Sequence, residues 1–152
     1  MANVNDVARY ILEKHGRSMS TMKLQKLVYY SQAWNLVWEE RPLFDSPIEA
    51  WANGPVIRVL YNCHRGRFTA EPDMFPGDSS RLTADEKETV DVVLHAYGEF
   101  SGQQLSDLSH NERPWQEARE GVPPGESSTN EVSRDVMQEY YSALLLSGAA
   151  AL

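Results

Sequence analysis

Cysteine is nearly absent from this sequence, since Cys63 is the single one among 152 residues. One cysteine cannot form a disulfide within the chain, and it cannot supply the cysteine cluster of a structural zinc site. No spacing typical of metal ligands connects the four histidines, which are His15, His64, His95 and His110. We therefore expect no metal and no organic cofactor. A reducing compartment, the cytoplasm, is the expected location.

Long apolar runs are also absent. No stretch approaches the ~20 apolar residues that a membrane-spanning helix needs, so we expect no membrane association. The N-terminus has no basic segment followed by an apolar run, which argues against a signal peptide. Hydrophobic residues still make up 41% of the chain and charged residues 24%, which is usual for a globular protein. The composition predicts one folded domain with its own core.

Basic residues are scarce, with 14 Lys and Arg against 22 Asp and Glu and a formal net charge of −8. Residues 1–70 contain nine basic and six acidic residues, whereas residues 71–152 contain five and sixteen. We expect no direct nucleic-acid binding, because contacts between basic residues and phosphates supply most of the affinity for nucleic acids and this chain is acidic. A basic protein partner fits the charge better. A negative surface that only keeps the protein soluble explains the same composition equally well.

Enzyme signatures are missing as well: there is no GxGxxG, GxxxxGK[ST], HExxH or GxSxG motif. Cys63 and His64 could suggest a thiol nucleophile with its base. Neighbours in sequence point in different directions on a helix, however, so the pair is poorly placed for that chemistry. A small hydrolase that uses Cys63, His64 or His110 is kept as the alternative to a binding protein.

Helix caps and breakers divide the chain into a series of predicted helices. These helices cover about residues 5–15, 20–38, 55–64, 83–97, 101–110 and 133–145, with Asn5, Ser20 or Thr21, Thr83, Ser101 and Ser133 as N-caps and one further turn after Pro114. Residues 48–51 alternate and predict a short strand, and residues 66–82 predict a long loop. The expected fold is mainly α: a single compact helical domain over residues 1–146, a short extended or β element near residues 48–52, and a flexible tail over 147–152. We expect Trp51 and Trp115 to be structural, because each lies beside a chain break.

The helix of residues 21–38 carries the most distinctive composition. Its core stripe is formed by Leu24, Leu27, Val28 and Trp34. The faces beside this stripe, together with the turn at 53–55, are predicted to bind a partner through Lys23, Lys26, Tyr30, Gln32, Asn53, Gly54 and Pro55. Two alternatives remain open. Tyr30 can widen the core stripe while the lysines are solvated, or the acidic residues Asp85, Glu86, Glu88 and Asp91 can form the binding surface instead.

Three blocks of sequence, in order, resemble the Panacea domain, the family of SocA-like antitoxins and phage-associated proteins. The blocks are MKLQKLVYYSQAW, PLFDSPIEAWANGPVIRVLY and LSHNERPWQEAR, and together they cover about residues 20–120. The matching positions are Lys23, Leu24, Gln25, Lys26, Leu27, Tyr29, Tyr30 and Gln32, then Pro42, Leu43, Phe44, Glu49, Ala50, Trp51, Gly54, Pro55, Val56 and Tyr61, then Leu108, Ser109, His110, Pro114, Trp115 and Ala118.

The resemblance implies a non-enzymatic antitoxin that neutralises a cognate protein toxin by direct contact. It also implies a possible second role as an adaptor that presents the toxin to a cellular unfolding protease. The C-terminal residues Ser147 to Leu152, small and uncharged, could serve as a handle for such a protease, although a frayed helix end is the simpler interpretation. Neither the identity of the toxin nor the oligomeric state follows from the sequence.

Overall fold

The computed structural model describes residues 1–150 and 152, and it shows a mainly helical protein with two small antiparallel sheets. In chain order the elements are α1 (Val4–His15), β1 (Met19–Ser20), α2 (Thr21–Trp38), β2 (Glu49–Trp51), β3 (Gly54–Val56), α3 (Arg58–His64), β4 (Thr69–Ala70), the 3-10 helices η1 (Pro72–Met74) and η2 (Ser79–Arg81), α4 (Ala84–Tyr97), α5 (Gly102–His110), α6 (Arg113–Ala118) and α7 (Arg134–Ser147). The predicted fold class, mainly α with a short β element, is confirmed.

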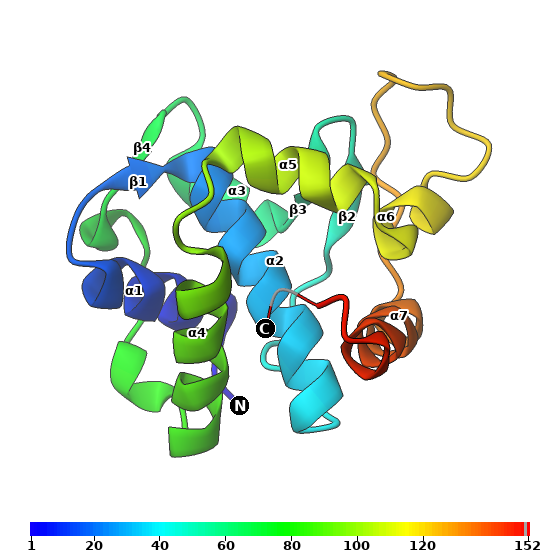
Figure 1. Ribbon diagram of the computed structural model, residues 1–152. Coiled ribbons are helices and arrows are strands. Elements are labelled where there is room, and N and C mark those ends of the chain that lie inside the picture. Colours follow the sequence, from blue (N-terminus) through cyan, green and yellow to red (C-terminus); the bar gives the residue numbers. More distant parts are fainter. Residues whose placement is uncertain (151) are drawn as a thin grey trace.

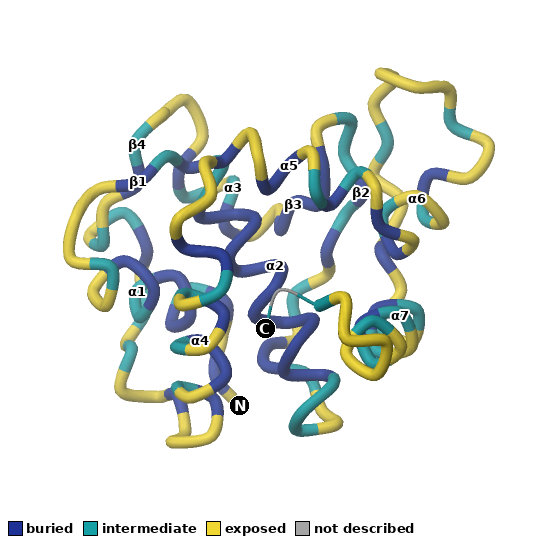
Figure 2. The backbone as a smooth tube through the Cα atoms, viewed as in Figure 1, coloured by how far each residue is buried: buried dark blue, intermediate teal, exposed yellow. Residues whose placement is uncertain are grey.

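Helix α2 runs through the middle of the molecule. Figure 1 shows α1 and α4 on one side of it and α7 on the other, with α5 crossing its N-terminal half. Every residue from 24 to 36 is buried, so the helix has no solvent-facing side over that length (Figure 2). Polar side chains within this range must therefore find hydrogen-bond partners inside the protein.

Local capping signals fix most of the helix ends. Thr83 and Glu86 form the predicted capping box at the start of α4, with N–O distances of 3.2 and 2.9 Å. Ser20, Ser101 and Ser133 also cap the helices that follow them, as predicted. The prediction of Asn5 as the first N-cap is wrong, because Asn3 forms a reciprocal capping box with Asp6 and the helix begins two residues earlier.

The strand predicted near residues 48–51 exists as β2, and it forms an antiparallel hairpin with β3 in which Ala50 pairs with Pro55. The prediction that Pro55 begins a helix is wrong, since Pro55 lies in β3 and the next helix begins at Arg58. Gly54 adopts a φ of 119°, a conformation that favours glycine, and this reverses the chain into the hairpin.

The segment 66–82, predicted as a loop, contains regular structure. Strand β4 pairs with β1, and η1 and η2 follow it. Two-residue strands and single 3-10 turns are too short to leave a periodic pattern in the sequence, so this part of the loop prediction is wrong.

The C-terminal residues follow the αL cap of α7 at Gly148. Ala150 and Leu152 lie half-buried against the core, and Ala151 lies outside the described residues. The domain boundary at residue 146 and the flexibility of 147–152 remain predictions. Over the described residues, no helix combines the length and hydropathy that crossing a membrane requires.

Candidate partner-binding surface

Three of the residues predicted to bind a partner are buried inside the protein. The exposed fraction is 2% for Lys26 and 0% for both Tyr30 and Gln32. The prediction that these side chains lie on exposed faces of the central helix is therefore wrong. Its physical reason is that α4, α5, α7 and the 43–44 segment cover the faces that a helix on the surface would leave open.

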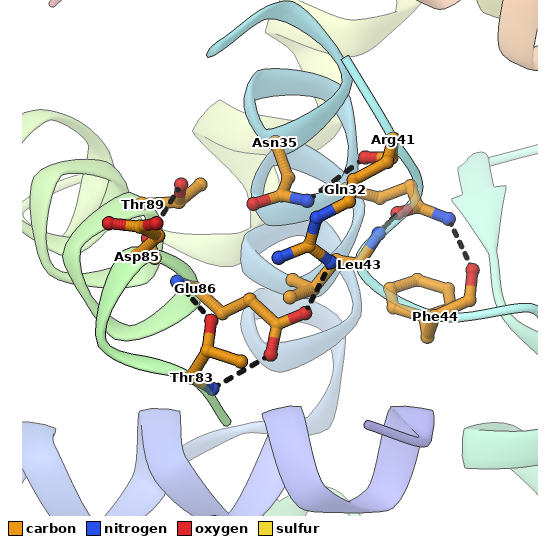
Figure 3. Close-up of polar contacts among 9 residues, drawn as sticks. All are labelled: Gln32, Asn35, Arg41, Leu43, Phe44, Thr83, Asp85, Glu86 and Thr89. Atoms are coloured by element: carbon orange, nitrogen blue, oxygen red, sulfur yellow. Dashed lines mark hydrogen bonds and ion pairs between the residues drawn. The ribbon is translucent and has the colours of Figure 1, made fainter. Parts of the chain in front are cut away.

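Gln32 holds a non-helical segment against α2. Its Oε1 accepts a hydrogen bond from the Leu43 backbone N–H at 2.6 Å, and its Nε2 donates to the Phe44 carbonyl at 2.8 Å (Figure 3). Gln25, two helical turns earlier, binds the backbone of Ile57 in the same way. Its Oε1 accepts from the Ile57 N–H at 2.9 Å, and its Nε2 donates to the Ile57 carbonyl at 3.2 Å. Each amide supplies the acceptor for a buried backbone N–H outside a helix or sheet, and it shares the carbonyl with a second donor: Arg134 at Phe44 and the Tyr61 N–H at Ile57.

Tyr30 belongs to a buried hydrogen-bond cluster centred on Glu112. The hydroxyls of Tyr30 and Tyr141 both donate to Glu112 Oε1, at 2.7 and 2.8 Å. The Tyr29 hydroxyl lies 3.0 Å from that of Tyr141, and the Tyr30 ring stacks on Tyr97 with centroids 4.4 Å apart. Burial raises the pKa of the Glu112 carboxyl, while the two tyrosine hydrogen bonds oppose this shift. The cluster joins α2, α7 and the start of α6.

Lys26 lies under the hairpin turn. Its ammonium donates to the Pro55 carbonyl at 3.2 Å, and burial lowers the pKa of Lys26 to about 8. A Cβ on Gly54 would lie only 2.7 Å from Lys26 Cε, so a larger residue there would displace the end of the lysine side chain in addition to straining the backbone at this φ. Gly54 and Pro55 are consequently buried too, and of the predicted turn only Asn53 is exposed.

Lys23 is half-buried and stabilises a helix end. Its ammonium donates to the carbonyl of Gly98, the C-cap residue of α4, at 2.5 Å. A cation at a helix C-terminus interacts favourably with the helix dipole. Burial lowers the pKa of Lys23.

The exposed hairpin tip borders a mainly apolar groove of about 340 Å³, which we call the hairpin groove. Its lining consists of Trp51, Ala52, Asn53, Val56, Arg58 and residues 127–129. Arg58 pairs with Glu49 at 3.0 Å, and its guanidinium carbon lies 5.3 Å from the centroid of the Trp51 ring. The groove therefore has an apolar floor and one ion pair near its edge, which suits a protein side chain.

The two tryptophans predicted to be structural contact each other's segments. Trp115 Nε1 donates to the Trp51 carbonyl at 2.9 Å, and the His110 ring stacks on Trp115 with centroids 4.2 Å apart. Trp115 thus links α6 to the hairpin.

The pair considered for an alternative hydrolase is not assembled as nucleophile and base. Cys63 Sγ lies 3.6 Å from Asn5 Oδ1, and burial raises the pKa of the Cys63 thiol, which disfavours the reactive thiolate. His64 is buried, with Nε2 3.0 Å from Gln25 Nε2, and burial lowers its pKa. Nothing in this geometry supports the hydrolase alternative.

Known proteins resemble this chain in the region that contains these features. Residues 24–116 match the family model described as Antitoxin SocA-like, Panacea domain, and the chain belongs to this family. Over 124 residues it is 32% identical to Antitoxin SocA of Caulobacter vibrioides, an alignment that covers 72% of this chain. The chain spans 66% of the length of that relative. No solved structure matches the chain.

Proposed function

We propose that this protein is an antitoxin of a toxin–antitoxin system, and that it neutralises a cognate protein toxin by direct contact. The observation that carries the proposal is the 32% identity to Antitoxin SocA, together with the family match over residues 24–116. The net charge of −8 adds support for a basic protein as the partner. A cytoplasmic location and delivery of the toxin to an unfolding protease are further parts of the proposal.

Of the seven residues predicted to bind, Asn53 is the one that the fold leaves exposed. The hairpin groove beside it is therefore the part of the predicted surface that a partner can reach. Asn53→Arg adds a large cation at the tip of the hairpin, and Gln103→Arg makes the same change in charge at an exposed position that does not line the groove. Loss of growth rescue in Asn53→Arg alone is the result expected if the hairpin binds the partner, and rescue by both variants excludes it.

Co-expression tests the proposed function. The chain is produced together with the protein encoded by the reading frame beside its own gene, and growth is compared with that of cells producing either protein alone. We expect the neighbouring protein to arrest growth and the chain to restore it. Growth arrest that persists despite abundant, folded chain contradicts the proposal for that protein.

A further inference from the structure

A second groove lies between the C-terminal end of α2 and the N-terminal half of α4. It measures about 200 Å³ and is lined by Trp38, Glu39, Asp85, Glu88, Thr89 and Val92. We call it the α2–α4 groove. Its size suits one side chain and excludes a helix, whose diameter with side chains is about 10 Å.

Three carboxylates of this groove have no ion-pair partner in the described part of the chain: Glu39, Asp85 and Glu88. The dipole of α4 stabilises Asp85 in its first turn. The same argument fails for Glu39, which is the C-cap residue of α2, where negative charge is unfavourable. Helix stability therefore does not explain why Glu39 lines the same groove as Asp85 and Glu88.

Asn35 supplies an independent observation beside the groove, one helical turn before Glu39, although it does not itself line the groove. The residue is 0% exposed, and its Nδ2 donates to the Arg41 carbonyl at 3.0 Å. Its Oδ1 is buried without a hydrogen-bond partner. Figure 3 shows this oxygen directed toward α4, on the side of Thr89, which lines the groove. Rotating the amide would place its oxygen against a carbonyl, so the unpartnered atom is an acceptor.

All these groups point to one kind of occupant. The carboxylates and Asn35 Oδ1 only accept hydrogen bonds. The indole of Trp38, which stacks on Trp34 with centroids 5.3 Å apart, lines the groove. A guanidinium has five N–H donors and no acceptor, is always charged, and stacks on aromatic rings. The same end of α4 already binds one guanidinium, because Arg41 Nη1 lies 2.9 Å from Glu86 Oε2 (Figure 3).

We propose that the α2–α4 groove binds an arginine side chain on the surface of the partner protein. Identification of that partner as the toxin rests on the proposed function, whereas the chemistry of the groove does not. The guanidinium lies against Trp38 and pairs with the three carboxylates. Contact between its innermost N–H and the buried Asn35 Oδ1 requires the side chains between α2 and α4 to move apart. The predominance of acidic residues after position 70 attracts such a partner over longer distances.

The first test needs no toxin. Acetyl-Gly-Arg-Gly-amide is titrated into the ¹⁵N-labelled protein, and the Trp38 indole N–H and the Asn35 side-chain amide are followed by NMR. A peptide with citrulline in place of arginine keeps the shape and removes the charge. The groove variant combines Glu39→Gln, Asp85→Asn and Glu88→Gln. The control variant makes the same change in net charge at three exposed acidic residues outside the groove: Glu71→Gln, Asp73→Asn and Glu120→Gln.

We expect the arginine peptide to shift both signals in the wild type and in the control variant. The groove variant should bind at least tenfold more weakly, and the citrulline peptide should leave the signals unchanged. Equal binding of both peptides, or equal binding by the two variants, overturns the proposal. The proposal is also overturned if CaCl2 alone shifts the Trp38 and Asn35 signals as much as the arginine peptide does, because the groove would then be a general cation site. If the triple variant melts early, Glu39→Gln against Glu120→Gln provides the same comparison.

The second test uses the co-expressed neighbouring protein. We expect the groove variant to lose growth rescue while the control variant keeps it. Rescue by both variants overturns the assignment of the groove to the toxin and leaves the antitoxin function standing. Failure of the wild type to rescue refutes the proposed function for that protein, and the peptide titration still decides the chemistry of the groove.

Discussion

Glu112 shows how one residue determines the packing of several elements. Its carboxylate accepts hydrogen bonds from Tyr30 and Tyr141, which belong to α2 and α7, and it directly precedes α6. In the sequence Glu112 follows a helix end and precedes Arg113-Pro114, a pattern typical of an exposed turn. Its burial depends on two tyrosines that lie 82 and 29 residues away, and no local pattern predicts contacts of that range.

Glu112→Ala should therefore destabilise the protein by about 2–4 kcal/mol, because it leaves two buried tyrosine hydroxyls without their acceptor. Glu112→Gln keeps an oxygen at that place and removes the buried charge, so we expect stability close to that of the wild type. Urea unfolding at neutral pH measures both. Equal losses in the two variants would contradict the role assigned to the oxygen.

The same carboxyl also sets a pH dependence. Since its pKa is raised in the folded state, the folded protein binds more protons than the unfolded chain in the window above the ordinary glutamate pKa. This contribution to stability is present at low pH and is lost as the pH rises through the folded-state pKa. Glu112→Gln should remove it, so the stability of the wild type relative to this variant should fall with rising pH. A constant difference would contradict the shift.

Lys26 makes stability depend on pH in the opposite direction, and it does so in the alkaline range. Its folded-state pKa of about 8 lies below the ordinary lysine value, so the unfolded chain binds more protons between the two values. Stability should rise with pH through this window. Relative to Lys26→Met, the wild type should gain about 2 kcal/mol between pH 7 and about pH 9.5. Urea unfolding of both proteins at the two pH values checks the gain, and parallel pH profiles would show that the lysine titrates normally.

At the scale of elements, the sequence predicts what is local and misses what is distant. The capping boxes and serine caps can be predicted from the sequence, because the donor and the acceptor lie three residues apart. The periodicity of α2 does not predict that the helix lies at the centre of the fold and is buried on all sides. Gln25, Lys26 and Gln32 look like the polar face of a surface helix until the segments that they bind are known. Their match to the family motif reflects contacts that build the fold.

Gln32→Ala tests this interpretation of the motif. The substitution leaves the backbone N–H of Leu43 buried without a partner and leaves the carbonyl of Phe44 with Arg134 alone, at 3.3 Å, so we expect a loss of about 1–3 kcal/mol. The matched control is Gln103→Ala, which removes an exposed amide bonded to Asp107 at 2.9 Å. The control should change stability by less than about 0.5 kcal/mol. Thermal melting of both variants decides, and a stable Gln32→Ala protein would show that the segment 43–44 is held by other contacts.

For the whole molecule, the helix caps and breakers predicted the class of fold, and the ordered blocks predicted the family. The predicted site was less successful, because exposure is a property of the complete packing. Five of its seven residues are buried, and Lys23 is half-buried. Sequence analysis kept Asp85 and Glu88 as an alternative binding surface but could not predict the α2–α4 groove, because Trp38 and Glu39 lie on another helix and meet these residues only when α2 and α4 pack together.

Direct contact with a protein toxin is the central claim, and calorimetry tests it most directly. The purified chain is titrated with the purified protein from the neighbouring reading frame, in the absence of protease and nucleotide, at two salt concentrations. We expect saturable binding at a fixed stoichiometry, weakened by salt, with affinity retained by the control variant and reduced at least tenfold in the groove variant. No heat of binding from a folded chain and an active toxin would contradict direct contact and with it the proposed function.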